Sequence, residues 1–113
     1  MAKLQQTISL PTNIKVGSLD INVRLYDNLI NISEDEGSYD GSKQTILIDK
    51  EIAERQNSYS FLVLWHELCH AIYDQHLLEA AKEEIVVNAY SHGFTMILRD
   101  NPDLKKWIDL CLK

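Results

Sequence analysis

Residues Ser58–Asp74, SYSFLVLWHELCHAIYD, contain the strongest local signal in the chain. Apolar side chains lie on nearly every side of a helix built from this stretch: Phe61, Leu62, Leu64, Trp65, Leu68, Ala71 and Ile72. Ser58 is expected to be the N-cap, because its hydroxyl can accept a hydrogen bond from a free backbone N–H. The stretch therefore predicts a buried helix from about Ser58 to Asp74.

The middle of this helix, His66-Glu67-Leu68-Cys69-His70, is an H-E-x-x-H motif. Residues four apart share one helix face, so His66 and His70 can direct ring nitrogens at one ion. Zinc binds imidazole readily and would offset the cost of burying these polar groups among apolar neighbours. Glu67 is offset round the helix, where it can act as general base toward a zinc-activated water. The motif predicts a Zn²⁺ site that hydrolyses peptide bonds.

A catalytic zinc needs a third protein ligand and an open fourth position. Glu84 is the first candidate, because Asn88 follows it by one helical turn and can support the ligand with a hydrogen bond. Glu83 is the second candidate, since it projects closer to the middle of the apolar stripe of the same helix. The choice between them stays open.

Two histidines are weaker candidates for the third ligand. His76 has the spacing of the third metzincin histidine, but Tyr73 stands where that pattern has glycine. His92 precedes Gly93 in a pair that faintly resembles the SprT-like proteases. Cys69 is expected to be a small, buried apolar residue rather than a ligand. Peptide hydrolysis also calls for an oxyanion stabiliser, and four donors are available without ranking: Tyr39, Tyr73, Tyr90 and His92.

The chain N-terminal to this helix has the spacing of strands. Residues 19–25 alternate between apolar and polar side chains, and Gly17-Ser18 can turn the chain back on Ile14 and Val16 to make a hairpin. Residues 31–42 are rich in Ser, Asp, Glu and Gly, which predicts a loop. Thr45–Ile48 is a short apolar run that predicts a further strand.

Helical spacing dominates the second half of the chain. Helices are expected at about Asp49–Arg55 and Leu78–Arg99, and Asn101-Pro102 is expected to begin a terminal helix. The change of character near Asn57 divides one domain, residues 1–113, into a β-rich part, 1–56, and a helical part, 57–113. The predicted fold class is α+β, with a small N-terminal sheet packed on the motif helix.

Composition excludes several classes of protein. The 113 residues include 11 Lys+Arg and 17 Asp+Glu, a formal net charge of −6, which argues against binding to nucleic-acid phosphates. No apolar stretch is long enough to span a bilayer, and the first residues lack the apolar segment of a signal peptide. Two cysteines, Cys69 and Cys111, make no disulfide framework, so a cytoplasmic location is expected.

Residues Trp65–Ile72, Glu83–Val86 and Leu98–Pro102 resemble the small ImmA/IrrE-like zinc metallopeptidases, which are common in phages and prophages. The resemblance implies a minimal zincin-like domain of gluzincin type, with two histidines and one glutamate on zinc. It implies that His66, His70 and Glu84 bind the metal and that Glu67 is the general base. Glu84 lies only 14 residues after His70, which is a short gap for this family.

The implied activity is that of a metallo-endopeptidase acting on a peptide or protein substrate. In zincins an edge strand beside the motif helix pairs with extended substrate, and Thr45–Ile48 is the strand expected to do so here. The alternative function is a non-catalytic zinc-binding domain that acts as a protein-interaction module. The sequence does not indicate the oligomeric state.

Overall fold

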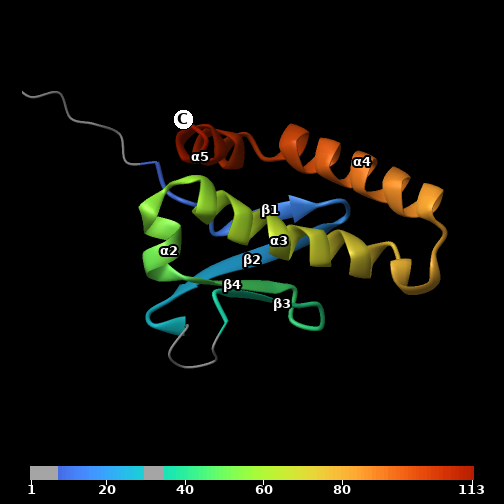
Figure 1. The fold of residues 1–113 in the computed structure, drawn as a ribbon, viewed down its shortest axis with the longest axis horizontal. Helices are drawn as coiled ribbons and strands as arrows, with labels where there is room; N and C mark the ends of the chain where they lie inside the picture. Colours follow the sequence, from blue (N-terminus) through green and yellow to red (C-terminus); the bar gives the residue numbers. More distant parts are fainter. Residues whose placement is uncertain (1–7, 30–34) are drawn as a thin grey trace, which may run out of the picture.

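The computed structural model describes residues 8–29 and 35–113 (Figure 1). Within these residues, four strands form one sheet with the order β1-β2-β4-β3: β1 (Asn13–Val16), β2 (Leu19–Tyr26), β3 (Gly37–Asp40) and β4 (Thr45–Asp49). They are followed by α2 (Lys50–Arg55), α3 (Ser58–Gln75), a 3₁₀ turn η1 (Leu78–Ala80), α4 (Glu83–Asp100) and α5 (Pro102–Cys111). The fold is therefore mixed α+β, as expected, with the strands preceding the long helices.

The predicted hairpin is confirmed. Strands β1 and β2 pair antiparallel, with Ile14 opposite Ile21, and Gly17 turns the chain at a φ of 60°. A side chain at Gly17 would also meet the Gln75 amide at 2.8 Å. Gln75 Nε2 donates a 3.0 Å hydrogen bond to the Val16 carbonyl, so the hairpin turn is tied to the end of α3.

Residues 31–34 of the predicted loop lie outside the described residues, and the predictions for residues 35–48 need correction. Strand β4 does form, but it lies between β2, which it pairs with in parallel, and β3, which it pairs with antiparallel. It therefore cannot offer a free edge to a substrate. The edge beside α3 belongs to β3, Gly37–Asp40, inside the stretch predicted to be a loop. This strand is short and largely polar, so the sequence pattern did not predict its pairing with β4.

Helix α3 crosses one face of the sheet and is not buried on all sides, contrary to prediction (Figure 1). Its buried stripe packs into the core shared with the sheet and the other helices: Val63, Leu64, Leu68, Ala71 and Ile72. A second stripe is exposed: Tyr59, Leu62, His66, His70 and Tyr73. The histidines therefore need no metal to offset a burial cost, and Glu67 is the buried polar residue of the motif.

The expected helix Leu78–Arg99 begins later than predicted. Leu77 adopts a left-handed conformation at φ 53°, η1 follows, and α4 starts at Glu83. Helix α4 packs on α3 through aromatic rings, with Trp65 stacked on Phe94 at a centroid distance of 4.3 Å. Pro102 begins α5 as predicted, and α5 buries Trp107 in the core.

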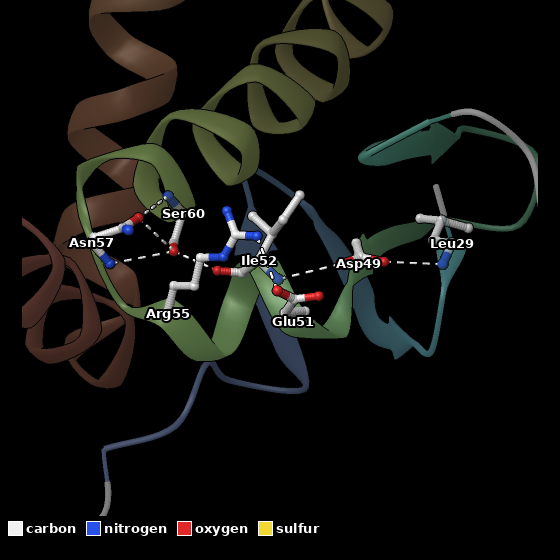
Figure 2. Close-up of polar contacts among 7 residues, drawn as sticks. All are labelled: Leu29, Asp49, Glu51, Ile52, Arg55, Asn57 and Ser60. Atoms are coloured by element: carbon white, nitrogen blue, oxygen red, sulfur yellow. Dashed lines mark hydrogen bonds and ion pairs between the residues drawn. The ribbon is translucent and has the colours of Figure 1, made fainter. Parts of the chain in front are cut away.

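The junction between sheet and helices is held by buried polar groups (Figure 2). Asp49, only 3% exposed, ends β4 and caps α2: its Oδ1 accepts from the Leu29 amide at 3.0 Å and its Oδ2 from the Ile52 amide at 3.3 Å. Asn57, not Ser58 as predicted, caps α3 through a 3.0 Å bond from the Ser60 amide. Ser60 Oγ in turn donates to the Ile52 carbonyl, so α2 and α3 are joined.

Replacing Asp49 with Ala is expected to lower the free energy of unfolding by about 3 kcal/mol, because the change removes a helix cap and two buried hydrogen bonds. Urea unfolding followed by tryptophan fluorescence measures this change. The control is Asp27→Ala, which removes an exposed carboxylate 3.9 Å from Lys50 and should change stability by less than about 0.5 kcal/mol. A loss below about 1 kcal/mol for Asp49→Ala would contradict the assignment.

Candidate metal and catalytic site

The two motif histidines point at a common position from the exposed stripe of α3. Their Nε2 atoms are 3.2 Å apart, and the ring planes meet at 78°. Two imidazole nitrogens bound tetrahedrally to one zinc ion at about 2.05 Å would lie about 3.3 Å apart. Without metal the same pair can share an Nε2···Nε2 hydrogen bond. The donor atoms are thus spaced as two adjacent ligands of a tetrahedral ion.

Glu67 lies beside the histidines, between α3 and strand β3. It is 5% exposed, and a side chain at Gly37 would approach its Oε2 to 3.1 Å. Glycine at position 37 therefore leaves room for the carboxylate under the edge strand. Burial raises the pKa of Glu67, while the charges of His66 and His70 oppose that shift. The carboxylate is thus shifted toward holding a proton.

A groove runs along α3 beneath β3, and the motif lies at its centre. Its larger hollow, of about 690 Å³, is lined on the α3 side by His66, Glu67, His70, Tyr73 and Asp74. Its smaller hollow, of about 380 Å³, is lined on the α3 side by Tyr59, Leu62, Val63, His66 and Glu67. Asp35 and Gly37 border both hollows. Space therefore extends to both sides of His66 and Glu67, as an extended chain bound across them would require.

The structure ranks the candidate oxyanion donors. Tyr39 on β3 and Tyr73 on α3 line the larger hollow with the motif, whereas His92 lines neither hollow of the groove. Burial raises the pKa of Tyr39, and the negative charge of nearby Asp74 raises it further. Tyr39 is therefore a neutral hydroxyl at the edge of the groove, close to Asp74.

The sequence reading missed Asp35, Gly37 and Asp74 as groove residues. Asp74 follows His70 by four residues, so its place on the histidine face was available from helical spacing. Asp35 and Gly37 carry no such signal, because they reach the motif only through the pairing of β3 with β4.

The candidates for the third ligand lie apart from the histidine pair. Glu84 and Glu83 are both exposed in the first turn of α4, and His76 and His92 are also exposed. Tyr90 is the α4 residue that borders the histidines, in a hollow of about 220 Å³. Glu83 shares a helix face with Tyr90, seven residues on, whereas Glu84 is offset by about a third of a turn. Among the described residues, no group of three or more His, Cys, Asp or Glu side chains is placed to hold a metal ion.

Cys69 lines this same hollow and is partly buried. Burial, followed by the charge of Glu67, raises the pKa of its thiol. Cys69 was expected to be buried and is partly buried, and the expectation that it does not bind the metal stays a prediction.

Comparison of the chain with family models, with curated proteins and with solved structures finds no match. None of the helices within residues 8–29 and 35–113 is long and apolar enough to cross a membrane.

Proposed function

We propose that this protein is a zinc metallo-endopeptidase, with His66 and His70 as metal ligands and Glu67 as general base. One observation carries the proposal: two imidazole nitrogens 3.2 Å apart share a groove with a buried, neighbouring carboxylate. The resemblance to the ImmA/IrrE-like peptidases supports it and suggests a phage or prophage context. Both cysteines are free thiols, which is consistent with the cytoplasmic location that we propose.

The residues present fit a zinc ion in part. His66 and His70 would hold it, and the third ligand would come from the acidic first turn of α4, where the resemblance favours Glu84 and Glu83 is the matched alternative. Bound there, zinc would act as a Lewis acid on water and on the peptide carbonyl.

The protein's own groups would carry the proton and position the substrate. Glu67, next to the metal position, takes a proton from the attacking water and delivers it to the leaving amine. β3 is an edge strand of the sheet that the described residues form, and its outer edge would pair with an extended peptide through main-chain hydrogen bonds, the role expected for Thr45–Ile48. Tyr39, which lines the larger hollow with the motif, would donate a hydrogen bond to the oxygen on which negative charge develops.

Metal analysis of the protein purified without a histidine tag tests the metal site. We expect about one equivalent of zinc per chain, and less than about half an equivalent after mild purification would contradict the site. Glu84→Gln is expected to weaken zinc binding by at least about tenfold, whereas the adjacent control Glu83→Gln leaves it unchanged. The opposite result would make Glu83 the third ligand.

The alternative is a zinc-binding interaction module without catalysis. It is favoured by the lack of a preassembled three-ligand cluster among the described residues. A module of this kind would bind zinc and lose nothing measurable on replacement of Glu67, which separates it from the peptidase.

A further inference from the structure

The smaller hollow of the groove combines an apolar wall with carboxylates. Leu62, 59% exposed, and Tyr59, 43% exposed, stand on α3, with Val63 below them. Asp35 and Glu36 line the same hollow from the segment that leads into β3. Exposed apolar side chains beside acidic groups can accommodate a side chain that has an aliphatic stem and a charged end.

Three carboxylates line the smaller hollow: Asp35, Glu36 and Glu67. The carboxylate of Glu36 accepts a hydrogen bond from the Tyr59 hydroxyl, which fixes its position at the rim. Asp35 borders both hollows together with Glu67. None of the described residues that line either hollow is Lys or Arg. Arg55 on α2 lies near enough to Tyr59 for an electrostatic interaction with its hydroxyl, but the Arg55 guanidinium is paired with Glu51 at 3.1 Å.

Glu67 supplies a second observation, independent of the charged rim. It is 5% exposed and lines both hollows, yet none of the described residues donates a hydrogen bond to its carboxylate. Its oxygens keep some exposure to the groove, so an occupant that covered them without supplying a partner would bear a desolvation cost. The groove around it is therefore built for an occupant that brings positive charge or hydrogen-bond donors.

We propose that the smaller hollow is a specificity subsite for a lysine or arginine side chain of the substrate. The aliphatic stem lies along Leu62 and the Tyr59 ring, and the ammonium or guanidinium group meets Asp35 and Glu36. This inference rests on the proposed peptidase function and names its substrate class: peptides with a basic residue at one fixed position beside the cleaved bond.

Selection of displayed random dodecapeptides on the zinc-loaded Glu67→Gln variant tests the subsite without requiring hydrolysis. We expect the selected peptides to share Arg or Lys at one position. Replacing that residue with norleucine should weaken binding about five- to tenfold at low salt, and less at 0.5 M salt, because exposed charge pairs are screened.

Adding Asp35→Asn and Glu36→Gln to this variant should remove the difference between the basic and the norleucine peptide. The matched control adds Glu79→Gln and Asp109→Asn, which delete two exposed carboxylates outside both hollows and should preserve it. A selection that yields no peptide or no common basic position, or a preference that survives Asp35→Asn with Glu36→Gln, would overturn the subsite. A selected peptide that the zinc-loaded wild type leaves uncut would contradict the peptidase function and leave the subsite standing.

Discussion

Glu67→Gln is expected to slow peptide hydrolysis by about 10²- to 10⁴-fold, the usual contribution of a general base. Glutamine has the same shape as glutamate but cannot take the proton of the attacking water. It also fits under Gly37, because it fills the same space as the glutamate side chain and glycine has no Cβ that would crowd it. The variant should therefore fold and bind zinc as the wild type does.

The measurement counts new peptide N-termini by mass spectrometry after incubation of the zinc-loaded protein with an unfolded protein mixture. Zinc content and the far-ultraviolet circular dichroism spectrum are recorded on the same samples. Glu79→Gln, an exposed glutamate on η1, is the control and should keep full activity. Equal activity in Glu67→Gln and the wild type would rule out Glu67 as the general base. Loss of zinc in the variant would instead assign Glu67 a role in metal binding.

Chelation of zinc is expected to lower the melting temperature by about 15 °C. A ligand present at 1,000 times its dissociation constant stabilises the folded state by about 4 kcal/mol, and each kcal/mol shifts the melting temperature of a domain of this size by about 4 °C. His70→Ala should melt near the metal-free wild type and show no response to chelator. The metal-free proteins should differ little, because His66 and His70 are exposed and their loss leaves no cavity.

His76→Ala and His92→Ala are the matched controls for this experiment. Both histidines are exposed and line neither hollow of the groove, so both variants should keep the full response to chelator. If the melting temperature of His76→Ala or His92→Ala no longer responded to chelator, the replaced histidine would be assigned as a metal ligand. If chelator did not change the melting temperature of the wild type, the proposed zinc site would be wrong.

The local elements were predictable wherever the signal lies in neighbouring residues. The hairpin follows from alternation around Gly17, and α5 follows from Asn101-Pro102. The start of α4 was missed because Ala81 and Lys82 have extended backbone that separates η1 from Glu83 without a glycine or proline to mark the break. Strand β3 was missed because its four residues are polar and gain their hydrogen bonds from β4.

The candidate site likewise has features that are local to one helix and features that depend on distant segments. The approach of His66 to His70 is a property of one helix, since residues four apart must share a face. The burial of Glu67 is not a property of one helix, because it depends on β3 passing over α3 with glycine at the point of contact. The exposure of the histidines was also misjudged, since apolar residues surround them in sequence but both side chains are exposed along the groove.

The sequence by itself determined the α+β class, the strands of the hairpin, the motif helix and the pair of nitrogens that face one point, because each arises from contacts within a few residues. Only the tertiary structure decided which strand lies at the edge and where the carboxylates Asp35 and Glu36 meet the motif. These features join segments that are distant in the chain, and their positions are set by packing across the whole core.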